Sequence, residues 1–173
     1  HLLGDFAFAI WDKTRARIFC ARDPLGVRQL YYEHRDGVFR CATEIGALFA
    51  DSKATPTPHR PSVGLYILGA YWDTGQTLYQ DIFALPAAHH AVVEAGQVKL
   101  TRYWSPDPFR QLATQSAADC AEQLHHTLRE AVACRMRSRG PIAAHVSGGM
   151  DSSSVAAVAA ELHHAGQGSA EPP

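Results

Sequence analysis

The residues best suited to chemistry stand together in the segment from Ser147 to Ser153, which reads Ser-Gly-Gly-Met-Asp-Ser-Ser. It lies between an apolar run at 142–146 and an alanine- and valine-rich stretch at 151–165, a pattern that predicts a strand, a glycine loop and a helix. The first turn of a helix presents unsatisfied N–H groups and a partial positive charge, and glycines let the backbone approach a ligand closely. The segment therefore predicts an anion site that suits phosphate.

A carboxylate within this loop, Asp151, indicates that a cation accompanies the anion, because a carboxylate alone repels phosphate. Mg²⁺ held by Asp151 and by phosphate oxygens would satisfy both groups, while the hydroxyls of Ser147 and Ser152 could donate to the phosphate. The Gly-Lys-Ser or Gly-Lys-Thr pattern of Walker nucleotide sites does not occur in the sequence. The alternative without a ligand is a glycine turn followed by a Ser/Asp helix cap.

The composition indicates a globular protein with small-molecule ligands. Of the 173 residues, 46% are hydrophobic, and 16 basic side chains balance 17 acidic ones. This balance argues against nucleic acid or an anionic membrane as a partner, and no apolar run is long enough for a membrane span or a signal peptide. We therefore expect a cytoplasmic protein. Because the chain begins with His1 and not with Met, we also expect it to be a fragment.

The cysteines and histidines give little sign of a metal site. Cys20, Cys41, Cys120 and Cys134 form no Cys-x-x-Cys pair, so neither a zinc site nor a disulfide framework is indicated, and we expect reduced cysteines in the core. The histidines occur largely as adjacent pairs. Adjacent side chains point in different directions, which makes such pairs poor chelators.

The first hundred residues predict a mostly antiparallel β region. Strands are expected at 5–12, 17–22, 30–34, 38–43, 88–94 and 97–104, with a helix at 44–50 and a second helix capped by Ser62. The first strand alternates large and small apolar residues and is expected to be buried on both faces. The turn at 23–26 and the Asp36-Gly37 dipeptide are signals for a β-turn and a hairpin.

The pattern changes after Ser105, where two prolines end the β region. A repeat of apolar residues at every fourth position predicts a long amphipathic helix from 116 to about 136. Helix, strand, glycine loop and helix then follow in an order typical of α/β proteins. We therefore expect an α+β region followed by an α/β region, with a domain boundary at about 105–115.

The glycine loop resembles the S-G-G-x-D-S signature of the ATP pyrophosphatase superfamily, which has an adenine nucleotide alpha hydrolase-like fold. Upstream, residues 4–12, 21–28 and 42–44, then Leu85-Pro86-Ala87 and Arg102-Tyr103-Trp104, are similar in the same order to the later part of the glutaminase domain of asparagine synthetase. The resemblance implies that residues 1–105 are the C-terminal portion of a type-2 glutamine amidotransferase domain. Residues 106–173 would be the N-terminal portion of the synthetase domain.

The resemblance implies a carbon-nitrogen ligase of two domains. We also expect the protein to form a homodimer. An N-terminal-nucleophile glutaminase, built on antiparallel sheets, would release ammonia from glutamine. The synthetase domain would adenylate aspartate with ATP and Mg²⁺, and ammonia would then form asparagine. On this mapping the ATP-binding residues are Val146, Ser147, Gly148 and Gly149, while Asp151 holds Mg²⁺ and Ser152 supports the pyrophosphate.

The glutaminase nucleophile of the family is an N-terminal cysteine, whereas residue 1 here is His1, so no catalytic residue is assigned and the chain alone is expected to be inactive. Gln29, Thr43 and Met150 replace the family's usual Pro, Ser and Leu. The alternatives are a lasso-peptide cyclase, which would take a precursor peptide, and a β-lactam synthetase. A third is a non-catalytic remnant that at most binds nucleotide.

Two further expectations concern single positions. Arg22 and Asp23 suggest an ion pair with a function, but a turn-fixing salt bridge or an Asx-type turn is the interpretation that we favour. His145, beside the glycine loop, is expected to be a packed core histidine.

Overall fold

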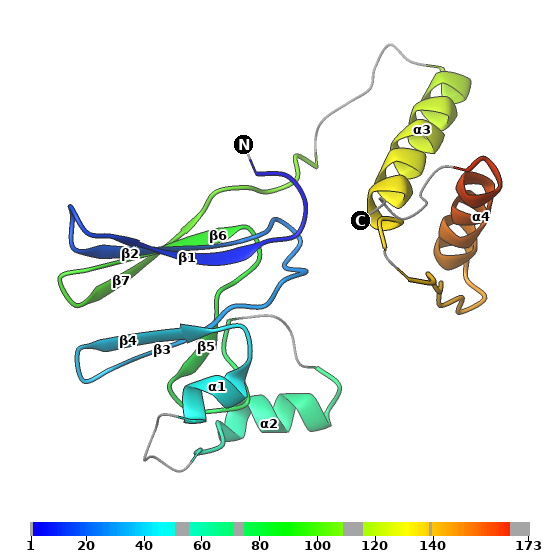
Figure 1. Cartoon of the computed structure of the whole chain (residues 1–173). Helices are drawn as coiled ribbons and strands as arrows, with labels where there is room; N and C mark the ends of the chain where they lie inside the picture. Colours follow the sequence, from blue (N-terminus) through cyan, green and yellow to red (C-terminus); the bar gives the residue numbers. More distant parts are fainter. Residues whose placement is uncertain (1, 51–55, 71–74, 109–115, 139, 167–173) are drawn as a thin grey trace. The chain divides into compact units, whose positions relative to one another are not determined.

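The computed structural model describes residues 2–50, 56–70, 75–108, 116–138 and 140–166 (Figure 1). The chain divides into two compact units, His1–Pro108 and Phe109–Pro173, which are described separately below. Within the described residues, no helix has both the length and the apolar character that a membrane crossing requires.

The first unit is built from two antiparallel sheets (Figure 1). One sheet has the order β1-β2-β6-β7 and consists of β1 (Ala7–Asp12), β2 (Arg17–Arg22), β6 (His89–Glu94) and β7 (Gln97–Arg102). The other has the order β4-β3-β5 and consists of β3 (Tyr31–Arg35), β4 (Val38–Ala42) and β5 (Ile82–Ala84). Two helices, α1 (Ile45–Ala50) and α2 (Arg60–Ile67), complete it, and α1 contacts β3 and β4. The α+β character expected for this region is confirmed.

Two hairpin turns explain the local pairing within these sheets. Asp36 and Gly37 join β3 to β4 with φ angles of 53° and 75°, and Ala95 and Gly96 join β6 to β7 with φ angles of 48° and 73°. Positive φ at both central residues is the type I′ geometry, whose twist matches that of the strands. The hairpin expected at Asp36-Gly37 is therefore confirmed.

The core of the first unit draws on both sheets. Its fully buried members are Cys20, Leu30, Leu85 and Ala91, with Phe39, Cys41 and other half-buried side chains packed against them. Because side chains alternate along a strand, Ile18 and Cys20 of β2 lie on the same face, which is the face toward this cluster. The sheets are thus held together by apolar side chains that β2, β4 and β6 contribute.

The expectation that the first strand is buried on both faces is wrong. Ile10 is 54% exposed and Trp11 is 59% exposed, although they lie on opposite faces of β1. The reason is that β1 lies at the edge of the four-stranded sheet and pairs only with β2 among the described residues. Alternation of apolar residues predicts a strand correctly but does not say what covers it.

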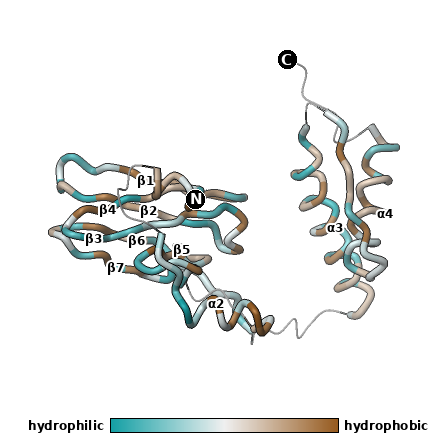
Figure 2. The backbone as a smooth tube through the Cα atoms, turned by 90° about the horizontal axis from the view of Figure 1, so that it is seen from below, coloured by the Kyte–Doolittle hydropathy of each residue, from teal (hydrophilic) through white to brown (hydrophobic). Residues whose placement is uncertain are grey.

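The second helix of the first unit begins earlier than expected. Its N-cap is His59 and not Ser62, whose side chain lies in the first turn and is 2.8 Å from the His59 ring nitrogen Nδ1. Pro61 occupies this first turn without loss, because the N–H that proline lacks would have no helical partner there. One end of α2 is hydrophobic (Figure 2), and Ile67 and Leu68 at its C-terminal end are exposed.

The second unit contains two packed helices, α3 (Ala117–Arg135) and α4 (Met150–His164). Ser116 and Asp119 form a reciprocal capping box at the start of α3, which confirms the helix expected there. Both helices contribute to one cluster, whose buried members are Val132, Met136, Val158 and Leu162. The spacing of Val132 and Met136, four residues apart, places them on the same face toward α4.

The strand expected at 142–146 is not present. These residues are exposed and adopt no regular structure between α3 and α4. A strand of a parallel sheet depends on neighbouring strands for its hydrogen bonds, and no described residue of the second unit belongs to a strand. The local sequence pattern is that of a strand, but the pairing partner that would stabilise it is absent from the described residues.

The turn after β2 is organised by a buried carboxylate. Asp23 is only 1% exposed, and its side chain accepts N–H groups from Leu25, Val27 and Arg28 at 3.1, 3.0 and 2.9 Å. The bond from the residue two positions along the chain, Leu25, is the Asx-type turn that the sequence favours. Gly26, with φ of 66°, donates its N–H to the main-chain carbonyl of Asp23 and completes the turn.

The neighbouring guanidinium of Arg22, 3% exposed, binds main-chain carbonyls. It donates to the carbonyl oxygens of Gly26, Leu85 and Arg28 at 2.6, 2.6 and 2.8 Å. One residue pair thus fixes the turn and also joins it to the chain segment at Leu85. We call these two side chains, with the backbone groups that they bind, the Arg22–Asp23 clasp.

The clasp makes stability depend on pH. Burial acts to raise the pKa of Asp23, but N–H groups of Arg28, Val27 and Leu25 outweigh it and hold that pKa below its usual value. A carboxyl whose pKa is lower in the folded state stabilises the fold above its unfolded-state pKa of about 4. That contribution is lost as the pH falls through the lowered folded-state value.

Replacing this carboxylate should therefore destabilise the first unit in a pH-dependent manner. We expect Asp23→Asn to lower the free energy of unfolding at pH 7 by about 1–3 kcal/mol, because a buried amide cannot accept the same three N–H groups. The difference in unfolding free energy between the variant and the wild type should become smaller toward about pH 3, as the wild-type carboxyl becomes protonated. Urea unfolding followed by tryptophan fluorescence measures this, since all three tryptophans lie in residues 1–104.

The control is Asp36→Asn, the same change in an exposed hairpin turn. It should change the unfolding free energy by no more than about 0.5 kcal/mol at any pH. A loss in Asp23→Asn that is equal at pH 3 and pH 7 would contradict the electrostatic role given to Asp23.

Candidate functional site

The glycine loop at the start of α4 adopts a defined conformation. Gly148 has φ of 85°, in the left-handed region, and Gly149, with φ of −82° and ψ of 161°, is the N-cap of α4. A Cβ added at Gly148 would meet nothing within 4 Å, so conformation and not space requires glycine there. Gly149 has no side chain, so no side chain of the N-cap residue accepts the first N–H groups of α4.

Serine hydroxyls converge on this loop. The Oγ atoms of Ser147 and Ser152 lie 3.1 Å apart, and the N–H of Ser147 donates to the Ser152 oxygen at 3.2 Å. The hydroxyls of Ser152 and Ser153 both donate to the carbonyl oxygen of Gly149, at 3.2 and 2.8 Å. The structure therefore brings together the two serines that the sequence analysis assigned to phosphate binding, one on either side of the glycines.

Asp151 lies in the first turn of α4 and is exposed, next to the half-buried Ser152. Among the described residues, no group of three or more His, Cys, Asp and Glu side chains is placed to hold a metal ion. A cation at Asp151 would thus take its other ligands from water and from a bound anion. That ligand set fits Mg²⁺, which retains waters and commonly binds one or two carboxylates together with substrate phosphates.

An apolar groove of about 570 Å³ lies beside the loop, between α3, residues 142–145 and α4. Asp151 and Ser152 line it together with apolar side chains such as Val132 and Ile142. His145 also lines this groove and is exposed, so its expected place in a packed core is wrong. The strand that would have buried His145 does not form, and its side chain therefore lies at the groove. Val146, the first of the expected ATP-binding residues, is 49% exposed.

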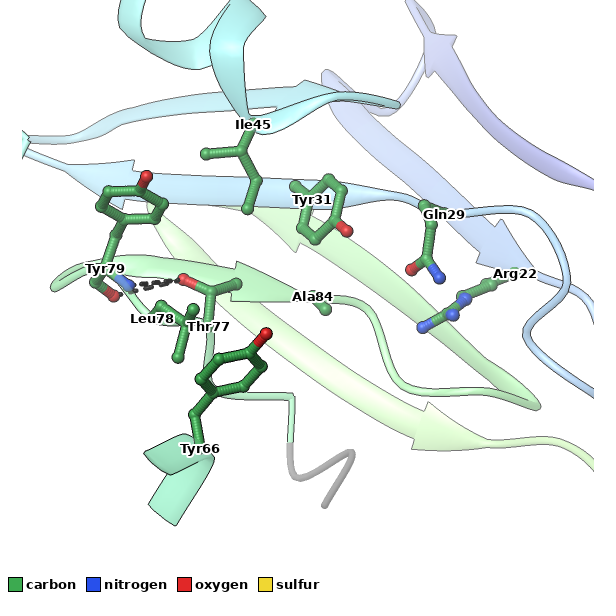
Figure 3. A pocket seen from close by; sticks show the side chains of 9 residues that line it. All are labelled: Arg22, Gln29, Tyr31, Ile45, Tyr66, Thr77, Leu78, Tyr79 and Ala84. Carbon is green, nitrogen blue, oxygen red and sulfur yellow. Dashed lines mark hydrogen bonds between the residues drawn. The ribbon is translucent and has the colours of Figure 1, made fainter. Parts of the chain in front are cut away.

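The first unit has its own cavity, of about 450 Å³, that the sequence analysis did not anticipate (Figure 3). Tyr31 of β3 and Tyr66 of α2 face it from different elements, and the Tyr79 N–H donates to Thr77 Oγ1 at 3.1 Å on its wall. Among the described residues that line it there is no carboxylate, histidine or thiol. Its residues come from distant segments, and no local motif marks them.

Comparisons with known proteins match both units. A glutamine amidotransferase domain family matches residues 1–104, and an asparagine synthase family matches residues 123–171. The first match covers more than half of the chain and corresponds to the unit with two antiparallel sheets. The second includes the glycine loop and α4.

Relatives of known name match over nearly the whole chain. "Asparagine synthetase [glutamine-hydrolyzing] 3" of Bacillus subtilis is 30% identical over 161 residues, which are 92% of this chain and 26% of that protein. "Putative asparagine synthetase [glutamine-hydrolyzing] 2" of Methanocaldococcus jannaschii is 29% identical, over 92% of this chain and 31% of the relative. "Amidase chyE" of Penicillium rubens is 30% identical, over 96% of this chain and 25% of that protein.

The chain therefore spans about a quarter to a third of the length of these relatives. The two family matches follow one another in the order that the sequence motifs indicated. Together with the two-sheet first unit and the serine-glycine loop, they show that this chain belongs to the glutamine-hydrolysing asparagine synthetase family.

Proposed function

We propose that this chain carries the pyrophosphate-binding loop of an ATP- and Mg²⁺-dependent, glutamine-hydrolysing asparagine synthase. The observation that carries the proposal is the contact between the Ser147 and Ser152 hydroxyls, which lie on either side of the left-handed Gly148 and of Gly149 at the start of α4. Hydroxyl donors next to a helix N-terminus favour a phosphate group. The family to which the chain belongs supplies the reaction in which that phosphate takes part.

Each residue of the loop has a stated task in this proposal. Ser147 and Ser152, whose hydroxyls lie 3.1 Å apart, would donate to phosphate oxygens, and the Ser152 hydroxyl would turn from the Gly149 carbonyl oxygen to do so. Gly148 and Gly149 expose backbone that a side chain would cover. Asp151 would hold Mg²⁺, which when bound neutralises charge on the phosphates. Val146 leads into the loop and completes the proposed ATP-binding set.

In the proposed reaction of the whole protein, the aspartate side-chain carboxylate attacks the α-phosphorus of ATP, and pyrophosphate leaves. Ammonia from glutamine then attacks the acyl carbon of the adenylate, which yields asparagine and AMP. The loop would contribute by binding the leaving pyrophosphate, the point at which negative charge accumulates. None of the four cysteines of this chain is assigned to glutamine hydrolysis.

A second candidate keeps the adenylation but changes the partners of the reaction. Two relatives whose names differ from asparagine synthetase, "Amidase chry2" of Gibberella zeae and "Amidase chyE" of Penicillium rubens, match 94% and 96% of this chain. Amide formation on another carboxylate would use the same loop. A lasso-peptide cyclase acting on a precursor peptide and a β-lactam synthetase are forms of this candidate, in which an internal amine replaces ammonia.

The loop is tested by the binding of magnesium pyrophosphate to this chain. We expect calorimetric titration to detect binding that requires Mg²⁺ and weakens about tenfold or more in Asp151→Asn, because the neutral amide loses its attraction for the cation. The control Glu130→Gln removes one negative charge from an exposed position on α3 and should leave the affinity unchanged. Equal affinity in Asp151→Asn, or binding without Mg²⁺, would contradict the assignment.

Catalysis is tested separately by exchange of labelled pyrophosphate into ATP in the presence of aspartate and Mg²⁺. We expect no exchange above background from this chain, because its loop and the 142–146 segment are exposed and do not form a closed pocket. Exchange that disappears in Asp151→Ala would show instead that the chain forms the adenylate by itself. In the corresponding longer protein, a panel of carboxylates in the same assay distinguishes aspartate from other substrates.

The backbone of the loop provides a further test. We expect Gly148→Ala to disturb the loop by about 1–2 kcal/mol, because a residue with a Cβ is strained at φ of 85°. Gly149→Ala is the matched change at φ of −82°, which alanine adopts freely. Amide chemical shifts of Ser147 and Ser152 in NMR spectra should move strongly in the first variant and little in the second. Similar shifts in both would refute the conformational role of Gly148.

A further inference from the structure

Two cysteines meet in the core of the first unit, although they belong to different sheets. Cys20 lies in β2 and is 1% exposed, and Cys41 lies half-buried in β4. Cys41 packs against the small buried cluster that Cys20 forms with Leu30, Leu85 and Ala91, and the pKa of each thiol is shifted by the other. The pair thus spans the interface between the β1-β2-β6-β7 sheet and the β4-β3-β5 sheet.

The two thiols are not equivalent. The hydrogen bond from Cys20 lowers the pKa of Cys41 to about 7, although burial opposes this, and the same bond together with burial raises the pKa of Cys20. Cys41 is also the more exposed of the two. Because the thiolate is the reactive form of cysteine, Cys41 is the nucleophile of the pair and Cys20 the thiol that reacts second.

We propose that Cys20 and Cys41 are a redox modification site, which a hydroperoxide converts into an intramolecular disulfide joining β2 to β4. This site is separate from the glycine loop and from the proposed ligase reaction. The other two cysteines, Cys120 and Cys134, lie on α3 in the second unit. The contact in the core is what singles out the first pair.

The reaction balances with hydrogen peroxide as the oxidant. The Cys41 thiolate attacks one peroxide oxygen, the O–O bond breaks, and the hydroxide that leaves takes up a proton to become water. The resulting Cys41 sulfenic acid is attacked at sulfur by Cys20. The S–S bond forms as the S–O bond breaks, and the proton of Cys20 leaves with the hydroxide as a second water. The thiols lose two electrons, and the peroxide gains them.

The site is tested on the whole reduced chain by treatment with hydrogen peroxide at neutral pH, alkylation of the remaining thiols and non-reducing peptide mapping. Trypsin should release residues 18–22 (IFCAR) and 41–53 (CATEIGALFADSK), each with one cysteine. We expect these peptides joined, with a mass lower than their sum by two hydrogen atoms. Cys41→Ser should abolish the linked peptide, and the matched control Cys134→Ser, at an exposed position, should retain it.

A second measurement does not depend on the folding of a variant. The oxidised wild-type chain should unfold at a temperature about 5–10 °C higher than the reduced chain, monitored by tryptophan fluorescence, because the cross-link restricts the unfolded chain. Dithiothreitol should reverse the shift. Recovery of the two peptides separately, alkylated or as sulfinic acids, would overturn the proposal. So would a linked peptide that forms only in urea-unfolded protein.

Discussion

The first unit depends on the way two adjacent buried charges are satisfied. A guanidinium and a carboxylate removed from water are costly unless hydrogen bonds replace their hydration. Arg22 and Asp23 obtain these bonds from backbone carbonyl and N–H groups between residues 25 and 28 and at Leu85. The backbone of Arg22 in turn accepts the Tyr103 hydroxyl at 2.6 Å. Turn, strand and sheet must therefore adopt one arrangement together, and the Arg22–Asp23 clasp fixes it.

The regular elements could largely be predicted because their signals are local. The Asp36-Gly37 turn, the alternation of large and small apolar residues along β1 and the apolar repeat at every fourth position of α3 each lie within the element they define or directly beside it. Features set by distant contacts were missed. The strand β5 has three residues and exists through its pairing with β3. The 142–146 segment carries a strand pattern but has no partner among the described residues.

The same distinction separates the two kinds of site. The serine-glycine loop is contiguous, so its residue types and spacing indicated phosphate binding before its geometry was known. The groove beside it, the tyrosine-lined cavity and the pairing of Cys20 with Cys41 join residues that are far apart or on different sheets. Spacing along the chain carries no information about contacts between such distant residues, so only the tertiary structure reveals these sites.

The order of strands in the larger sheet has a kinetic consequence. Two local hairpins, β1–β2 and β6–β7, are joined through the pairing of β2 with β6, in which Ile18 lies opposite Val93. The chain between β2 and β6 must close into a loop, and the entropy lost in closing it is not offset until the strands pair. Sheets of this kind therefore fold more slowly than two helices that follow one another in the chain pack together. The hydrogen bond from Arg22 to Leu85 spans the same gap. We therefore expect this long-range bond to form late, together with the pairing of β2 and β6, whereas the other bonds of the clasp and the two hairpins are local.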